Sequence, residues 1–360
     1  MTRRATGATG LVKAWLALCA GVLLLGTYGT ASAVPWYVLY DQGDSPVTGG
    51  ILAARALALS SDDTTIYSGW IQWQQGTVRQ HDAQAVGPIL NSYSLGSPQL
   101  NNQARALATD DRGNVYVGRN ASGNGEIEIR NATLGTQVAG PFGGSTSLVE
   151  GLSVWHSGLS YFLYVSRANG TIQRFNVTTP GAPALDSSWA TGGTYTVPGA
   201  GNLRGIEVAS DGTIYVTQRD TTGGDRNGFV YEIDPTLASS FSASVRGAMD
   251  VAIYDAELYI SEYLGSDSAI AVLDAATLGL VDTLDTGYNR GSGYGYTGID
   301  VAADGRIYLA DEWYSTEGLN RDRILTTYPL QEEPNGPIPE PTTLLLLGLG
   351  LLGIRRRKTL

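Results

Sequence analysis

Three acidic side chains recur in a repeated stretch of the sequence, and they are the first candidates for chemistry. Glu207, Asp250 and Asp300 each lie within a short alternation of apolar and polar residues, and we expect them at equivalent positions of consecutive repeats. Converging carboxylates are hard oxygen ligands that suit Ca²⁺ or Mg²⁺. Three such groups without partners would repel one another and raise their pKa values. The sequence therefore predicts that a metal ion binds them, or that they hydrogen-bond backbone groups and water in the channel and pair with nearby arginines.

Arginines close to two of the three acids offer the second way to neutralise them. Arg204 stands three residues before Glu207, Arg246 stands four residues before Asp250, and Arg219 ends a neighbouring strand. A guanidinium in the site would repel a metal ion. We therefore predict no tight metal site and a mixed-charge binding face. A Ca²⁺ or Mg²⁺ site formed by the three acids is the alternative.

These acids belong to a repeat that is aligned on one tyrosine. Its clearest copies, residues 205–216 and 298–309, consist of a strand, an Asp-Gly turn and a returning strand that contains Ile-Tyr. Six copies are separated by intervals of 49, 48, 51, 44 and 49 residues and are aligned on Tyr67, Tyr116, Tyr164, Tyr215, Tyr259 and Tyr308. A period of about 50 residues built from short strands is typical of the blades of a β-propeller.

We predict an all-β, six-bladed β-propeller over residues 34–330. The sixth repeat ends after its third strand, and residues 36–40 are expected to supply the fourth. Pairing of an N-terminal strand with the last blade would close the ring and leave no open edge there.

In such a propeller the first strand of each blade lines the central channel, and its start meets the end of the second strand on one face. Besides the acids and arginines above, this places on the channel face Trp70, Arg119, Arg167, Glu262, Asp311 and Glu312. Aromatic residues near strand ends can stack on sugar rings, although packing between blades is their more common role. The aromatic candidates are Trp70, Trp73, Tyr263, Trp313 and Tyr314.

The body of the chain lacks the residues of several common catalytic mechanisms. Cys19 is the only cysteine, and both lysines, Lys13 and Lys358, stand in the end segments, which excludes thiol and Schiff-base chemistry from the body. His81 and His156 are not expected on the channel face, so we predict no histidine acid–base pair. No catalytic residue is predicted.

The body is strongly acidic. Residues 34–338 carry 16 basic and 33 acidic side chains, a net charge of −17. Such a surface argues against nucleic acid and anionic membranes as partners.

The first 33 residues have the organisation of a secretory signal peptide. Arg3, Arg4 and Lys13 precede an apolar run over residues 15–25, and Ala31 and Ala33 form a small-x-small cleavage site. The apolar run is short for a membrane span of about 20 residues. We expect cleavage after Ala33.

The last 22 residues contain three elements in order. Pro339, Glu340 and Pro341 precede an apolar segment over residues 342–354, and a basic cluster follows at residues 355–358. This tail resembles the PEP-CTERM sorting signal of Gram-negative bacteria. The resemblance implies Pro339, Glu340 and Pro341 as the recognition motif of an exosortase, a membrane-embedded cysteine protease. It also implies export through the inner membrane, a transient C-terminal transmembrane helix as anchor, and then a surface or extracellular location.

The sixth repeat also resembles an NHL-type blade, with Gly-Ile-Asp-Val, Gly-Arg-Ile-Tyr-Leu-Ala-Asp and Asn-Arg-Asp-Arg-Ile phrases between residues 298 and 324. NHL propellers include binding platforms, hydrolases and lyases, so the resemblance implies the fold more than an activity. The six-bladed gluconolactonase-like enzymes hold a divalent metal with carboxylates and amides. Here Leu107 and Ser153, at the positions we match to the acids, supply no amide ligand.

The sequence thus predicts a signal peptide over residues 1–33, a propeller over 34–330, a linker over 331–338 and a sorting and anchor segment over 339–360. The first functional hypothesis is an exported, non-enzymatic module that binds a polysaccharide or protein of the envelope or biofilm matrix. The alternative is a metal-dependent hydrolase or lactonase that acts at the channel.

Overall fold

The computed structural model describes residues 36–41, 53–71, 76–84, 89–95, 103–121, 123–219, 227–264, 267–287, 295–314 and 320–327. The predicted signal peptide, linker and sorting segment lie outside the described residues.

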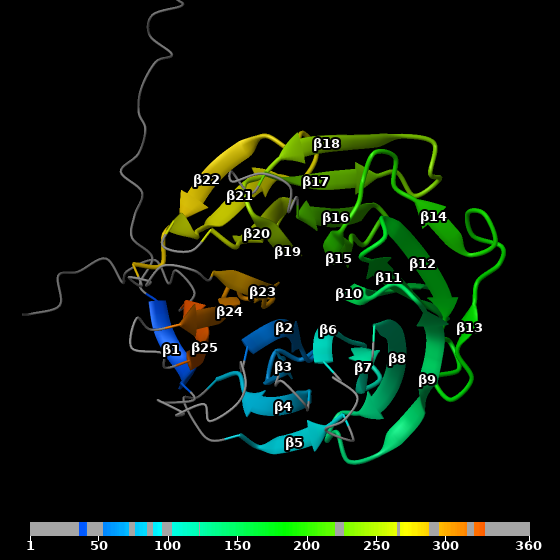
Figure 1. The fold of residues 1–360 in the computed structure, drawn as a ribbon, viewed down its shortest axis with the longest axis horizontal. Helices are drawn as coiled ribbons and strands as arrows, with labels where there is room; N and C mark the ends of the chain where they lie inside the picture. The colour runs from blue at the N-terminus through cyan, green and yellow to red at the C-terminus, as the bar shows by residue number, and fades with distance from the viewer. Residues whose placement is uncertain are drawn as a thin grey trace, which may run out of the picture.

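The described strands form six sheets arranged in a ring around a central channel (Figure 1). Blade 1 consists of β2 (Ala53–Leu59), β3 (Thr65–Ile71), β4 (Thr77–Asp82) and β5 (Asn91–Ser94). Blade 2 consists of β6 (Gln103–Thr109), β7 (Asn114–Ala121), β8 (Asn124–Asn131) and β9 (Gln137–Ser145). Blade 3 consists of β10 (Val149–Ser157), β11 (Ser160–Arg167), β12 (Thr171–Asn176), β13 (Ala184–Leu185) and β14 (Thr194–Thr196).

The second half of the ring repeats this arrangement. Blade 4 consists of β15 (Leu203–Val208), β16 (Ile214–Arg219), β17 (Gly228–Ile233) and β18 (Ser240–Ser244). Blade 5 consists of β19 (Ala248–Tyr254), β20 (Glu257–Glu262), β21 (Ile270–Asp274) and β22 (Leu280–Leu284). Blade 6 consists of β23 (Tyr296–Val301), β24 (Ile307–Tyr314), β25 (Asn320–Thr327) and β1 (Trp36–Asp41). The predicted six-bladed propeller is confirmed.

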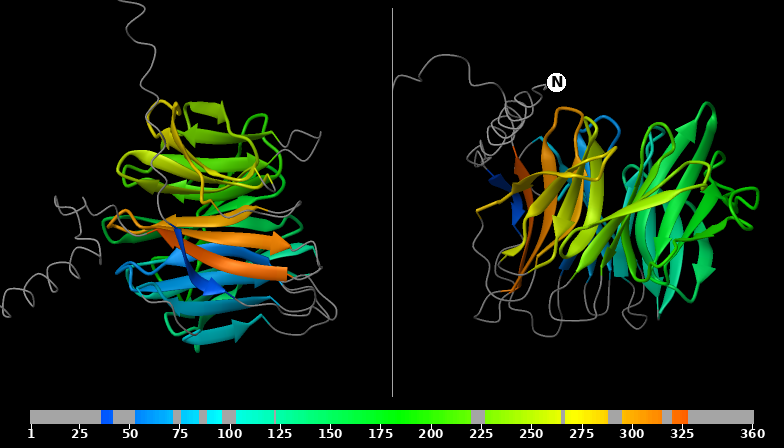
Figure 2. Two further views of the ribbon diagram at one scale, coloured as in Figure 1. Left: turned by 90° about the vertical axis from the view of Figure 1, so that its left-hand side faces the viewer. Right: turned by 90° about the horizontal axis from the view of Figure 1, so that it is seen from above.

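The N-terminal strand closes the last blade, as predicted. β1 pairs antiparallel with β25, with Trp36 opposite Thr327 and Asp41 opposite Arg323. The first and last described strands therefore lie side by side at the edge of the ring (Figure 2). Backbone hydrogen bonds within the sheet of blade 6 therefore close the ring.

The repeated tyrosine explains why the period is visible in the sequence. The Tyr67 hydroxyl of blade 1 donates to the Ala132 carbonyl of blade 2 at 2.7 Å. The Tyr308 hydroxyl of blade 6 donates to the Ala83 carbonyl of blade 1, also at 2.7 Å. Tyr215 of blade 4 reaches blade 5 in the same way. Three of the six tyrosines thus link one blade to the next, while the hydroxyls of Tyr116, Tyr164 and Tyr259 have partners within their own blades. The apolar core lies mainly between neighbouring blades.

Every inner strand also has a break in its register near its start. β2 shifts between Ala54 and Ala56, and β6 shifts between Ala104 and Ala106. The inner strands of the other four blades shift at the corresponding place. A bulge of this kind bends a strand and re-aims the side chain of the extra residue. The residues at this place are Arg55, Arg105, Glu150, Arg204, Met249 and Thr297.

Candidate functional site

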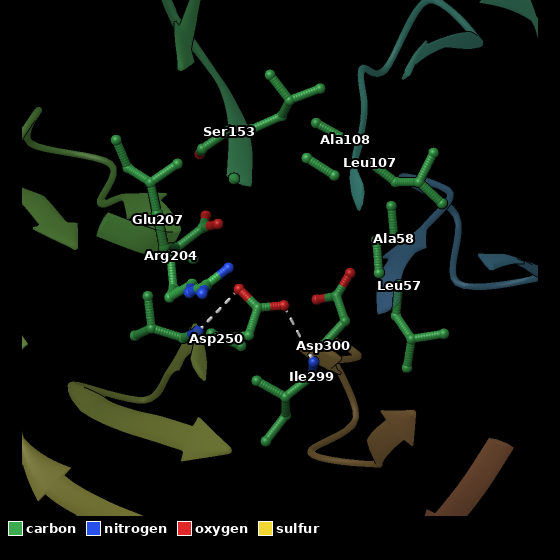
Figure 3. A pocket seen from close by; sticks show the side chains of 18 of the residues that line it. Leu57, Ala58, Leu107, Ala108, Ser153, Arg204, Glu207, Asp250, Ile299 and Asp300 are labelled. Atoms are coloured by element: carbon green, nitrogen blue, oxygen red, sulfur yellow. Dashed lines mark hydrogen bonds between the residues drawn. The ribbon is translucent and has the colours of Figure 1, made fainter. Parts of the chain in front are cut away.

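The channel contains a cavity of about 250 Å³ that is lined by the inner strands of all six blades (Figure 3). Its wall includes the bulge residues named above and, further along the same strands, Glu207 and Asp300. Arg204 and Glu207 are three residues apart on β15, which is roughly 10 Å along a strand. The cavity therefore has a level of bulge residues, which we call the mouth, and a deeper level of acids, which we call the interior.

The structure corrects the predicted equivalence of the three acids. Glu207 pairs opposite Tyr215 and Asp300 pairs opposite Tyr308, but Ala252 is the residue opposite Tyr259. Asp250 therefore lies two residues earlier in its strand, at the level of Gly205 and Gly298. The inner-strand residue opposite the tyrosine lies one position closer to it in sequence in blade 5 than in blades 4 and 6, so alignment of the copies on the tyrosine does not reveal this offset.

The remaining blades contribute small side chains at the level of Glu207 and Asp300. These are Ala58, Ala108 and Ser153, each opposite the repeated tyrosine of its own blade. The predicted match of Leu107 to this level is wrong, because Leu107 pairs with Val117 and is buried. The predicted match of Ser153 to the level of Glu207 and Asp300 is correct, because Ser153 pairs opposite Tyr164.

Backbone N–H groups satisfy the interior acids. The Asp300 carboxylate accepts from Leu59 N of blade 1 and from Val301 N, both at 2.8 Å. The Asp250 carboxylate accepts from Val251 N at 3.0 Å and from Ile299 N of blade 6 at 3.2 Å. Figure 3 shows both carboxylates and that of Glu207 directed toward the open centre. Each of the two aspartates thus holds the next blade in place as well as lining the cavity.

The three acids share raised pKa values. Burial raises the pKa of Asp250 to about 7, and the nearby Asp300 adds to this. Burial likewise raises the pKa of Asp300 to about 6, with a smaller contribution from Asp63. The pKa of Glu207 lies well above its usual range because of burial and then the charges of Asp300 and Asp250, opposed by a hydrogen bond with Ser153. Proximity of like charges and loss of water act in the same direction.

The predicted neutralisation of these acids by arginine is not what the structure shows. Arg204 pairs with Glu150 at 2.6 Å, at the mouth. Arg219 lies over the ring of Tyr263, with its guanidinium carbon 4.3 Å from the ring centroid. Arg246 is exposed and is absent from the cavity wall. The described partner of Arg204 is thus Glu150 of the neighbouring blade, which spacing along the sequence does not reveal.

The ion-pair network at the mouth was not predicted from the sequence. Glu150 bridges two arginines, with Oε1 2.8 Å from Arg105 Nη1 and Oε2 2.6 Å from Arg204 Nη1. Arg55 Nη2 lies 3.2 Å from Glu312 Oε2. Glu312, which is predicted on the channel face, therefore belongs to this network. A signal was present in the sequence, because Arg-Ala-Leu-Ala occurs at residues 55–58 and 105–108 and Arg-Gly-Ile-Glu occurs at 204–207.

The guanidinium groups of the mouth are crowded. The pKa of Arg105 is lowered by burial, opposed by Glu150, and lowered further by the charges of Arg55 and Arg204. Burial raises the pKa of Glu312, while Arg55 and a hydrogen bond with Tyr263 act against that rise. The three mouth arginines face two carboxylates, so the mouth carries an excess positive charge in an otherwise acidic protein.

Two other residues predicted on the channel face, Arg167 and Trp70, are buried and make contacts within the fold. Arg167 is buried and donates to the carbonyls of Ser147, at 2.9 Å, and Gly125, at 3.3 Å, so it joins blade 3 to blade 2. Burial lowers its pKa to about 10. Trp70 is fully buried and donates its indole N–H to Ser68 at 2.6 Å, so it cannot stack on a ligand.

Arg119, Glu262 and Asp311, which are also predicted on the channel face, do not line the cavity. Arg119 pairs with Glu126 at 2.6 Å. Glu262 is partly buried, and burial raises its pKa to about 7. Asp311 is buried and has an interaction partner. Trp73 lies outside the described residues, as do the side chains of Trp313 and Tyr314.

The two histidines do not line the cavity either. His81 is buried in blade 1, where Nε2 lies 2.8 Å from Ser68 Oγ. Burial lowers its pKa to about 4. His156 packs against Tyr161, with ring centroids 5.4 Å apart.

Within the described ranges, no group of three or more His, Cys, Asp and Glu side chains lies close enough to hold a metal ion. The alternative in which Glu207, Asp250 and Asp300 form a metal-ligand set is therefore not supported by their arrangement. A search for membrane-spanning helices in the same part of the chain finds none of the necessary length and hydropathy.

Comparisons with known proteins identify the C-terminal segment and the fold. Residues 337–358 match the PEP-CTERM protein-sorting motif, as the tail predicted. This motif implies that the protein is exported, has a C-terminal anchor region and is processed by an exosortase. The search of curated protein sequences gives no significant match.

Among solved structures, a chain of the mitotic checkpoint complex aligns with a TM-score of 0.52 and 15% identity, over 84% of this chain and 95% of that chain. The Dos1 propeller aligns with a TM-score of 0.43 and 14% identity, over 76% and 68%. The Cps50 (Swd1) β-propeller domain of Myceliophteria thermophila aligns with a TM-score of 0.45 and 11% identity, over 82% and 100%. At such identities the likeness concerns the fold alone. No comparison tests the NHL subtype.

Proposed function

We propose that the protein is an exported, non-enzymatic binding module whose ligand site is the mouth of the propeller channel. The observation that carries this proposal is the cluster of Arg55, Arg105 and Arg204 on three inner strands, which pair with Glu150 and Glu312 among the described residues. These side chains line a cavity, and clustered arginines are typical of sites that recognise carboxylate or phosphate groups.

The sorting tail supports a role at the cell surface. A PEP-CTERM motif marks the chain for an exosortase, so we expect the propeller to act on the outer side of the inner membrane. A polysaccharide or a protein of the envelope or extracellular matrix is the expected partner. The hydrolase or lactonase alternative has no specific observation in its favour, because the interior acids use backbone N–H groups as partners and do not form a metal-ligand group.

Binding to cell-surface material tests this function. The purified full chain should retain isolated envelope and matrix fractions in a pull-down assay, and the double variant Arg105→Gln/Arg204→Gln should lose that retention. Arg246→Gln is the matched control, because Arg246 is an exposed arginine outside the cavity wall. Equal retention by wild type and the double variant would contradict the assignment of the site to the mouth.

The sorting role is tested separately. Glu340→Ala changes the centre of the Pro-Glu-Pro motif, and cell fractionation should then find the protein in the inner membrane. Unchanged release of the Glu340→Ala protein would contradict processing at this motif.

A further inference from the structure

The charged groups of the cavity form two levels of opposite sign. The mouth holds Arg55, Arg105 and Arg204 with two carboxylates, and the interior holds Glu207, Asp250 and Asp300. The mouth side chains retain limited access to solvent, with exposed fractions of 23% for Arg55, 22% for Arg105 and 13% for Arg204. An anion that enters the mouth would therefore meet guanidinium groups first.

The mouth arginines also have unused donors. The Nε atoms of Arg55 and Arg204 are buried and have no hydrogen-bond partner among the described residues. Arg55 and Arg204 each donate to a single carboxylate through one terminal nitrogen, and Arg105 donates to Glu150 through Nη1 and to Gln103 through Nε. A guanidinium has further N–H groups in a planar fork, which fits the two oxygens of a carboxylate. One bound carboxylate would use these donors and offset the excess positive charge.

The interior limits what the ligand can carry besides this one group. At pH 7 the interior carries a partial negative charge, chiefly on Asp300, whose pKa is about 6, and in part on Asp250, whose pKa is about 7, and this charge repels a second anionic group. A phosphate monoester carries roughly −1.5 to −2 charges at neutral pH and would be repelled more strongly than a carboxylate. Carboxylates and the Ser153 hydroxyl instead accept hydrogen bonds, and hydroxyl groups supply them without charge.

We propose that the mouth binds the carboxylate of a sugar acid, with Arg105 and Arg204 on the carboxylate and Glu207 and Ser153 accepting from its hydroxyl groups. This assignment deepens the proposed function and rests on it. The cavity of about 250 Å³ lies just below the range of roughly 300–1,000 Å³ that is typical of small-molecule pockets. That space suits a single monosaccharide unit.

Calorimetric titration of the full chain at pH 7 tests the proposal with four probes. These are D-glucuronate, D-glucose as its uncharged counterpart, acetate as a carboxylate without hydroxyls, and inorganic phosphate. We expect glucuronate to bind at least tenfold more tightly than each of the others. Arg105→Gln and Arg204→Gln should each weaken glucuronate binding about tenfold or more, since hydrogen bonds to charged groups contribute roughly 1.5–3 kcal/mol. Arg246→Gln should leave it unchanged.

A variant that binds a probe more tightly than wild type must be folded, so it separates the loss of a ligand contact from the loss of folding. In Asp250→Asn/Asp300→Asn the interior loses charge while the mouth is intact, so phosphate should bind more tightly than to wild type. Equal binding of glucose and glucuronate, preference of wild type for phosphate, or no gain in this double variant would each overturn the proposal. If glucuronate fails but envelope material is still retained through Arg105 and Arg204, the binding function stands and only the ligand class is wrong.

Discussion

The charged side chains at the mouth and in the interior of the channel have different kinds of partner. At the mouth, Glu150 and Glu312 neutralise arginines through side-chain ion pairs. In the interior, Asp250 and Asp300 accept hydrogen bonds from backbone N–H groups, including those of the neighbouring blade. The pKa values of Asp250 and Asp300 are raised to about 7 and about 6, whereas at the mouth burial raises the pKa of Glu312 but the charge of Arg55 opposes that rise.

This difference separates the roles of the two levels. Side-chain ion pairs at a partly exposed site can rearrange to admit a competing carboxylate. Backbone donors are fixed by the sheet, so the interior acids mainly hold blades together and set the sign of the deeper cavity. A change at the mouth is therefore expected to act through unpaired charge, and a change in the interior through pH.

The largest effect is expected from Glu150→Gln. This change leaves Arg105 and Arg204 close together without their shared carboxylate, and breaking a buried ion pair costs about 3–5 kcal/mol. Because the arginines are partly exposed, we expect a loss of about 3 kcal/mol in the free energy of unfolding, measured by urea denaturation. Glu126→Gln is the control, since its pair with Arg119 is more exposed and should contribute less than about 1 kcal/mol. Similar losses in both variants would remove the distinction between mouth and surface pairs.

A buried base outside the channel provides a pH dependence of opposite sign to that of the interior acids. The pKa of His81 is lowered to about 4 by burial, against 6.5 for a free histidine. A depressed pKa contributes stability above pH 6.5 that is lost as the pH falls toward 4. Between pH 8 and pH 5 this amounts to about 2 kcal/mol. His81→Gln should remove that loss, and denaturation curves at both pH values measure it. An unchanged pH profile in His81→Gln would contradict a neutral buried His81.

The interior acids should show the reverse dependence with a smaller amplitude. The pKa of Asp250 is raised to about 7, so its folded state binds a proton more readily than its unfolded state does. Its contribution to stability is complete at low pH and is lost as the pH rises through 7. Asp250→Asn should reduce the gain in stability between pH 8 and pH 5 by about 1 kcal/mol, since the open cavity admits water that screens the charge. A steeper profile in the variant would show that Asp250 is held ionised.

The smallest effect is expected from Arg246→Gln. Sequence analysis grouped this residue with the interior acids, but its side chain is exposed and does not line the cavity. Surface substitutions of this kind change stability by less than about 0.5 kcal/mol. A loss in the free energy of unfolding as large as that of Glu150→Gln would show that Arg246 takes part in the charged network.

The sequence by itself determined the fold and the C-terminal sorting motif. Six tyrosines at a period of about 50 residues predict six blades, because each copy is one supersecondary unit with the same local pattern. The missing fourth strand of the sixth repeat predicted the pairing of β1 with β25, since a sheet edge needs a partner. The Pro-Glu-Pro motif, apolar segment and basic cluster likewise predicted the sorting signal that the comparison finds. These features are local patterns, which a linear chain displays directly.

Only the tertiary structure decided which charges meet. The pairing of β19 with β20 places Ala252 and not Asp250 opposite the repeated tyrosine, so Asp250 is offset from Glu207 and Asp300 although its sequence context is similar. Arg55 and Glu312 are 257 positions apart and come together because blade 6 closes onto blade 1. Glu150 likewise reaches Arg105 and Arg204 on the two neighbouring blades. Ion pairing depends on side-chain direction at distances of a few ångströms, and repeat spacing does not specify that direction.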